Sequence, residues 1–112
     1  MIFKQMNIYI IGYPWCPHFQ NSLKQLETFF PKKIHPVLIP LDLPNRKRMQ
    51  QEIKNIIGSK QQIYNYALTS PQIIVEKNNN MICIPGEDAL MRVGPENIEE
   101  YCTRAYFHSH VR

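Results

Sequence analysis

The stretch from Ile8 to Phe30 constrains the fold most, because an apolar run, a turn and an amphipathic helical pattern follow one another within it. Ile8 to Ile11 is a β-branched and aromatic run typical of a strand, and Gly12 to Pro14 interrupts it. From Pro17 onward, apolar residues recur with the spacing of one helix face. These residues are Phe19, Leu23, Leu26 and Phe30. We therefore predict a strand, a tight loop and a helix.

One cysteine, Cys16, lies where the predicted loop meets the predicted helix. Pro17 suits the first helical position, where a backbone N–H would have no partner in any case. Cys16 is thus expected at or next to the helix N-cap, where unpaired N–H groups and the helix dipole stabilise an anion. Since the thiolate is the reactive form of cysteine, we predict that Cys16 is a nucleophile. A buried structural cysteine is the alternative.

A second strand and a second helix follow. Pro31 closes the first helix, and Val37 to Ile39, enclosed by two prolines, is predicted to be a fully buried strand. A strand, a crossover helix and another strand predict a parallel pair. The second helix is predicted from Asn45, as its N-cap, to a stop at Gly58. Its apolar stripe is Met49, Ile53, Ile56 and Ile57, and its face rich in Arg, Lys and Gln is expected in solvent. Residues 59–68 fit either a short helix or a loop.

The last third of the chain predicts a hairpin and two helices. Strands are expected over Gln72 to Val75 and Met81 to Ile84, joined by a turn at residues 77–80. Pro85-Gly86 turns the chain sharply before an acidic helix start at Glu87-Asp88. A last helix begins at Pro95 and carries an apolar face made of Ile98, Tyr101, Cys102, Ala105 and Tyr106. The order βαβαββα predicts an α/β fold, with helices on both faces of a four-stranded mixed sheet.

Length and composition limit the class of protein. The 112 residues, 1–112, suit one domain with a core that needs no disulfide or metal. No apolar run approaches the length of a membrane span, so no membrane association is expected. Three scattered cysteines suit a reducing compartment, and we predict a cytoplasmic protein with Cys83 and Cys102 as core residues. His108 and His110 lack further metal ligands, so no metal site is predicted.

The formal net charge of the chain is +4. The basic residues alternate with Gln and apolar positions, without the aromatic platform of a nucleic-acid surface. Solvated helix faces explain most of them, and no nucleic-acid partner is expected. The positive charge can also steer a small anion such as a tripeptide dicarboxylate.

Three motifs at the predicted strand ends resemble those of the glutaredoxins, in the thioredoxin superfamily. They are Cys16-Pro17-His18-Phe19, Thr69-Ser70-Pro71 and Pro85-Gly86-Glu87-Asp88. The resemblance covers about residues 7 to 106. It implies a single glutaredoxin-like domain with a thioredoxin-like fold, and a glutathione-dependent thiol–disulfide oxidoreductase with Cys16 as its nucleophile. The partners it implies are glutathione and glutathionylated or disulfide-containing proteins, and we expect a monomer.

The same resemblance assigns the binding residues. Pro71 corresponds to a proline that follows a cis peptide bond, and the backbone of Ser70 would face Cys16 and pair with the cysteinyl part of glutathione. The turn at Gly86, Glu87 and Asp88 looks like the one that holds the γ-glutamyl end. There, backbone N–H groups meet the carboxylate of the ligand and an acidic side chain meets its ammonium group.

Departures from the family pattern modify the expected chemistry. Phe19 stands where a dithiol glutaredoxin has its second cysteine, which implies a monothiol cycle resolved by glutathione. Tyr13 stands in place of a lysine and is expected to line the groove, while Lys60, Gln61 or Gln62 could hold the glycyl carboxylate instead. Trp15, Pro17 and His18 are expected modulators of the thiol. They are the neighbours of Cys16 in the chain.

The sequence also bears on an iron–sulfur cluster and on an alternative function. Cys-Pro-His-Phe does not match the Cys-Gly-Phe-Ser motif of the glutaredoxins that carry iron–sulfur clusters. A cluster is therefore not expected, and glutathione is the expected co-substrate. The alternative function is a glutaredoxin-fold binding or adaptor protein with weak or no catalysis, since the lysine and the second thiol are both missing.

Overall fold

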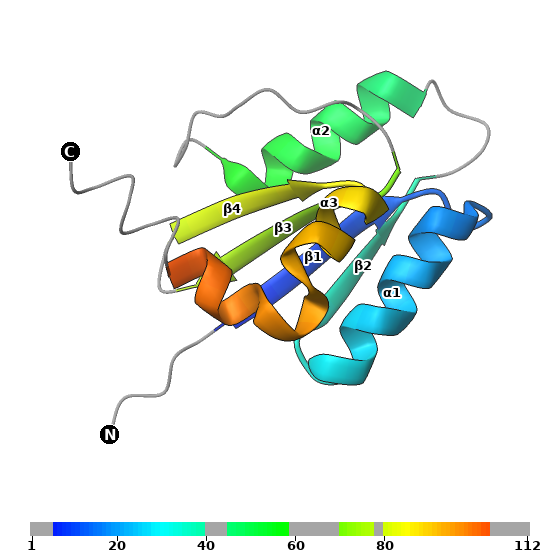
Figure 1. Cartoon of the computed structure of the whole chain (residues 1–112). Helices are drawn as coiled ribbons and strands as arrows, with labels where there is room; N and C mark the ends of the chain where they lie inside the picture. The colour runs from blue at the N-terminus through cyan, green and yellow to red at the C-terminus, as the bar shows by residue number, and fades with distance from the viewer. Residues whose placement is uncertain (1–5, 40–44, 59–69, 78–79, 104–112) are drawn as a thin grey trace.

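A computed structural model of the chain describes residues 6–39, 45–58, 70–77 and 80–103. The elements are β1 (Met6–Gly12), α1 (Pro17–Phe29), β2 (Ile34–Leu38), α2 (Asn45–Ile57), β3 (Gln72–Lys77), β4 (Asn80–Pro85), α3 (Glu87–Val93) and the short 3-10 helix η1 (Pro95–Asn97). Residues 98–103 are again helical. Within the described residues this is the predicted order of strands and helices (Figure 1).

The four strands form one mixed sheet in the order β2-β1-β3-β4. β1 and β2 are parallel, as the crossover through α1 predicts, and Ile8 lies opposite Ile34. β3 is antiparallel to both β1 and β4. The α/β class and the four-stranded mixed sheet are thus confirmed, and they are compatible with a thioredoxin-like fold.

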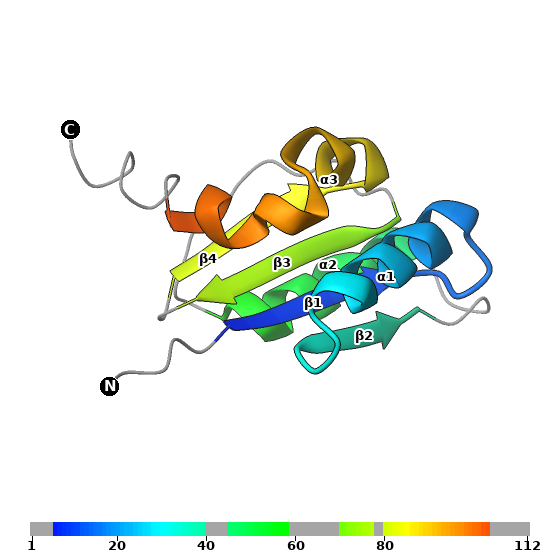
Figure 2. The same cartoon turned by 60° about the horizontal axis from the view of Figure 1, so that its bottom comes forward.

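Helices cover both faces of the sheet, with α1 and α3 on one face and α2 on the other (Figure 2). Successive strand residues point to opposite faces, so β1 and β3 supply both cores. Ile10 and Ile73 pack under α1 and α3, while Ile11 and Ile74 pack under α2. Cys16 belongs to the first of these two cores.

The helix α1 follows its sequence pattern closely. Pro17 occupies the first helical turn, and Phe19 and Leu26 are buried at 2% and 0% exposure. The other two residues of the predicted stripe, Leu23 and Phe30, are partly buried against the same core. The helix ends at Phe29, just before Pro31, as the sequence predicts.

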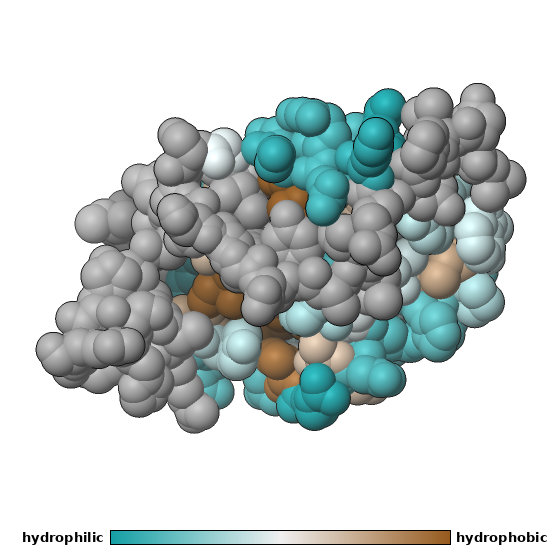
Figure 3. Space-filling view, turned by 90° about the horizontal axis from the view of Figure 1, so that it is seen from above, coloured by the Kyte–Doolittle hydropathy of each residue, from teal (hydrophilic) through white to brown (hydrophobic). Residues whose placement is uncertain are grey.

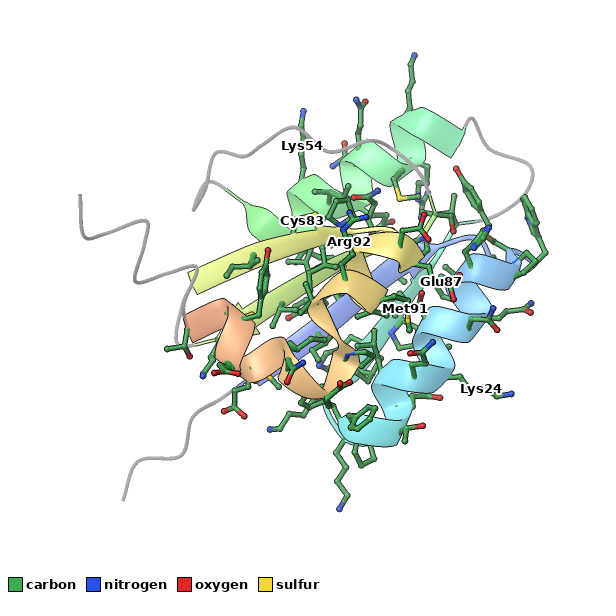
Figure 4. The ribbon with its side chains drawn as sticks, in the orientation of Figure 1. Lys24, Lys54, Cys83, Glu87, Met91 and Arg92 are labelled. Carbon is green, nitrogen blue, oxygen red and sulfur yellow. The ribbon has the colours of Figure 1, made fainter. Side chains whose placement is uncertain are left out.

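The helix α2 also has its predicted buried and exposed sides. Met49 and Ile53 are fully buried, and Gly58 ends the helix with a φ of 62°. Seen from the α2 side, much of the described surface is hydrophilic (Figure 3). Lys54 points away from the sheet (Figure 4). The polar face of α2 is therefore exposed, as expected.

The strand β2 corrects one prediction. The sequence pattern predicts a fully buried strand, but β2 is an edge strand whose residues are half-buried or exposed, and Leu38 is 53% exposed. Pro36 lies inside the strand, opposite Ile10, and not before it. A proline cannot donate to a ladder, so it fits an edge strand and not a central one. The prediction of full burial was wrong for Val37 and Leu38, whereas Ile39, directly after the strand, is fully buried.

The last helical segment buries Ile98 and Cys102, while Tyr101 is 38% exposed. Ala105 and Tyr106 lie outside the described residues, as do residues 59–68 and the centre of the predicted hairpin turn. Within the described part of the chain, no helix is both long enough and apolar enough to cross a membrane.

Ser22 is a polar residue on the buried face of α1, with 0% exposure. Its Oγ has no hydrogen-bond partner among the described residues. A buried hydroxyl without a partner carries a desolvation penalty. We expect Ser22→Ala to raise the free energy of unfolding by about 1 kcal/mol. Urea denaturation measures this, and a loss of stability would show that the hydroxyl has a stabilising partner.

Candidate functional site

Cys16 is the N-cap residue of α1, as the sequence predicts, with extended backbone angles of φ −76° and ψ 124°. Its N–H donates to the carbonyl of Tyr13 at 3.0 Å, and its own carbonyl accepts from the N–H of Gln20 at 3.0 Å. The side chain of Gln20 also donates to the carbonyl of Pro14 at 2.7 Å. These bonds fix the loop on both sides of the cysteine and hold its sulfur at the start of the helix.

Ser70 lies beside this cysteine although 54 residues separate them in sequence. The Cys16 thiol donates to the Ser70 carbonyl at 3.8 Å, and the N–H of Tyr13 donates to the Ser70 Oγ at 3.2 Å. The Ser70–Pro71 peptide bond is cis, as the resemblance implies. The two turns that the sequence singles out therefore meet at Cys16.

Gly12 allows this close approach. A Cβ atom at Gly12 would lie 2.5 Å from the Ser70 Oγ and 2.6 Å from Cδ2 of Phe19. Both distances are shorter than a real Cβ contact. The lack of a side chain at Gly12 is thus what lets the Ser70 turn and the first turn of α1 close on β1.

Phe19 occupies the position at which a dithiol motif has its second cysteine. Phe19 points into the core, with 2% of its surface exposed, and packs in the same cluster as Cys16. Cys16 itself is only 7% exposed. The first turn of α1 therefore presents one thiol at the edge of the core, beside a buried aromatic ring.

An open pocket of about 260 Å³ lies next to this turn. It is lined by His18, Ser70, Pro85, Gly86, Glu87 and Asp88. Gly86 has a φ of 95°, in a region that favours glycine, and precedes the first turn of α3. The three segments that the resemblance assigns to glutathione, around Cys16, Ser70 and Gly86, thus contribute to one surface.

Glu87 and His18 are bonded across this pocket. Nδ1 of His18 lies 2.7 Å from Oε1 of Glu87, which joins the first turn of α1 to the first turn of α3. Glu87 lies at the start of α3, on the side that faces α1 (Figure 4). The expected modulator of the thiol is therefore held by an acidic residue of the opposite wall.

Two aromatic residues precede the thiol in the loop between β1 and α1. The rings of Tyr13 and Trp15 stack with centroids 5.4 Å apart and an interplanar angle of 7°, and Trp15 is 52% exposed. Burial raises the pKa of the Tyr13 phenol above its ordinary value, and negative charge on Cys16 raises it further. Tyr13 is thus neutral at physiological pH and offers an aromatic surface beside Trp15.

Several residues weighed in the sequence lie outside the part of the chain that the structure describes. Lys60, Gln61, Gln62 and Thr69 lie outside the described residues, and so do His108 and His110. In the part of the chain that is described, no three His, Cys, Asp or Glu side chains group as metal ligands would.

The two other cysteines lie apart from this site. Cys102 is 4% exposed in the α1 and α3 core, as predicted, whereas Cys83 on β4 is only half-buried. The Cys83 thiol donates to Oε1 of Gln72 at 3.7 Å. Burial raises the pKa of the Cys102 thiol to about 11, against a smaller opposing effect of the Lys77 charge.

This pKa predicts that Cys102 resists alkylation in the folded protein. At pH 7 its thiolate fraction is on the order of one in ten thousand, and its sulfur is buried. Iodoacetamide at pH 7 should leave Cys102 unmodified, whereas the same reagent in urea should modify all three cysteines. Peptide mapping measures this. Modification of Cys102 in the folded chain as fast as in urea would contradict its burial.

Two features of the site do not follow from the sequence. One is the His18–Glu87 bond, and the other is the Tyr13–Trp15 stack. The only signal for the first was that both residues belong to motifs assigned to one binding site. The signal for the Tyr13–Trp15 stack was weaker, since it was only that one tight loop contains two aromatic residues.

Comparison of the chain with models of known protein families gave no match, and comparison with curated proteins gave none. The fold and the geometry around Cys16 are therefore the grounds on which a function is proposed.

Proposed function

We propose that the protein is a glutathione-dependent thiol–disulfide oxidoreductase of the glutaredoxin type, which works in the cytoplasm as a monomer and uses Cys16 alone. One observation carries the proposal. The thiol at the N-cap of α1 lies 3.8 Å from the Ser70 carbonyl, beside a pocket formed by the turn at Gly86. Helix N-termini are a recurrent position for nucleophilic cysteines in proteins.

The proposed cycle needs a single protein thiol. The Cys16 thiolate attacks the glutathione sulfur of a mixed disulfide, and the substrate protein leaves as its thiolate. Cys16 is then joined to glutathione by a disulfide bond. The thiolate of a second glutathione attacks the glutathione sulfur of this adduct, which yields glutathione disulfide and frees Cys16. Because a buried phenylalanine, Phe19, replaces the second cysteine, the first turn of α1 offers no second thiol to compete with glutathione.

The proposed glutathione-binding residues are those that the resemblance to glutaredoxins assigns. The backbone of Ser70, next to Pro71, pairs with the cysteinyl part of glutathione, and the turn at Gly86, Glu87 and Asp88 receives the γ-glutamyl end. Tyr13 lines the opposite side of the groove. Glutathione is the co-substrate, and the proposal includes no bound iron–sulfur cluster.

The experiment is a turnover assay with a glutathionylated peptide, glutathione, glutathione reductase and NADPH. Turnover should depend on free glutathione and show ping-pong kinetics, because the adduct on Cys16 must form and then be resolved. Turnover sustained by a dithiol reductant but not by glutathione would contradict the proposal.

A glutaredoxin-fold binding protein is the second candidate. The low exposure of Cys16, 7%, favours it, since a nucleophile must be reached by a disulfide. Such a protein should give no turnover and should bind the same partners after Cys16→Ser. Glutathione-dependent turnover above the uncatalysed rate would exclude this candidate.

A further inference from the structure

We infer that His18 is a positioning residue of the glutathione pocket, which holds the Glu87 carboxylate so that this charge does not repel the carboxylate of the γ-glutamyl end of the ligand. This inference rests on the proposed function. It concerns a residue pair that is separate from the thiol chemistry itself.

The geometry supports a specific bond between the two side chains. Nδ1 of His18 lies 2.7 Å from Oε1 of Glu87, a distance typical of a strong, charge-assisted hydrogen bond. The Glu87 side chain is 18% exposed and the His18 side chain 67% exposed, so the carboxylate is the more enclosed of the two. Both residues line the 260 Å³ pocket. The bond therefore determines where the carboxylate lies on the pocket wall.

The charges that line the pocket suggest what the His18–Glu87 bond does. Its described lining has two carboxylates, on Glu87 and Asp88, and His18 is the one side chain of that lining able to carry positive charge. The γ-glutamyl end carries one ammonium group and one carboxylate. The resemblance assigns the ammonium group to Asp88. An unpaired Glu87 would then face the ligand carboxylate as a like charge, which lowers affinity at close range.

The alternative is that the bond only ties α1 to α3. A structural tie predicts a loss of stability in either single variant and no dependence on the charge of the ligand. Repulsion by Glu87 makes a different prediction. Removing His18 weakens binding only while Glu87 is charged and only for ligands that carry the γ-glutamyl carboxylate.

The experiment measures binding of S-methylglutathione by calorimetry and KM and kcat with a glutathionylated peptide. His18→Ala should weaken binding and raise KM by roughly tenfold with a smaller change in kcat, the size expected for one unpaired like charge in a partly solvated site. Glu87→Gln added to His18→Ala should recover most of the loss. His18→Asn, which keeps an N–H donor at the same reach, should lose less than His18→Ala.

Two controls separate the causes. An S-methylglutathione whose γ-glutamyl carboxylate is amidated should bind His18→Ala as well as it binds the wild type. His35 is a matched control, because it bonds Asn7 and stacks on Tyr9 at the opposite edge of the sheet from β4. His35→Ala should bind S-methylglutathione like the wild type.

The outcomes distinguish this inference from the proposed function. A wild-type protein that neither binds S-methylglutathione nor turns over the peptide would overturn both. Wild-type binding with equal affinity in His18→Ala would overturn the role of His18 alone. A loss in His18→Ala that Glu87→Gln does not recover, or that the amidated ligand also suffers, would show a structural tie and overturn the inference.

Discussion

Replacing Cys16 by serine is expected to lower deglutathionylation by at least about a thousandfold, because a serine hydroxyl stays protonated near neutral pH and cannot form the disulfide intermediate. The substitution is nearly isosteric, and Cys16 occupies the N-cap of α1, a position where serine is favoured. The fold should therefore persist. The measurement is turnover of a glutathionylated peptide with glutathione and glutathione reductase.

Cys83 provides the matched control for this substitution. It is half-buried on β4 and lies outside the pocket. Cys83→Ser should retain wild-type turnover, although it removes one thiol, as Cys16→Ser does. Equal turnover by the wild type and Cys16→Ser would end the proposal that Cys16 is the nucleophile.

Gly12→Ala should impair both stability and turnover. The added methyl group would lie 2.5 Å from the Ser70 Oγ and 2.6 Å from a ring carbon of Phe19, so both neighbours must move or β1 must shift away from them. Overpacking of this kind costs about 1–3 kcal/mol of unfolding free energy. The Ser70 Oγ accepts from the Tyr13 N–H and the Ser70 carbonyl accepts from the Cys16 thiol, so displacing the Ser70 turn should also reduce turnover, by about tenfold or more. Urea denaturation and the peptide assay measure the two effects.

Gly58→Ala is the control that separates a loss of stability from a loss of turnover. Gly58 has a φ of 62°, and among the described residues no atom lies within 4 Å of where a Cβ would stand. Alanine there meets backbone strain, about 1–2 kcal/mol, and no clash with those residues. This variant should lose stability and keep turnover per folded molecule. If Gly12→Ala instead keeps both wild-type stability and wild-type turnover, the close packing of β1, Ser70 and Phe19 is not what organises the site.

The parts of the fold that depend on local pattern were predicted from the sequence. The start of α1 at Cys16-Pro17, the burial of Leu26 and the end of α2 at Gly58 follow from spacing and from the backbone preferences of proline and glycine. The burial of β2 was not predicted correctly. A short apolar run between prolines has the same pattern in a central strand and at an edge, and only the strand order distinguishes them.

In the site, too, local motifs were predicted from the sequence and contacts between distant segments were not. The motifs predict which turns come together. The Cys16 sulfur lies 3.8 Å from the Ser70 carbonyl oxygen, and Ser70 and Gly86 line one pocket. The bond between His18 and Glu87 spans 69 residues and depends on how α1 and α3 lie against each other. No local pattern encodes that arrangement, so the pair could be recognised only in three dimensions.

Cys16 is tested most directly as the nucleophile by the covalent adduct that it forms with glutathione. The wild-type protein is incubated with glutathione disulfide, its mass is measured intact, and the modified cysteine is located by peptide mapping without reduction. We expect one glutathionyl group, on Cys16, which is released by reduced glutathione. No adduct, or an adduct confined to Cys83 or Cys102, would contradict it.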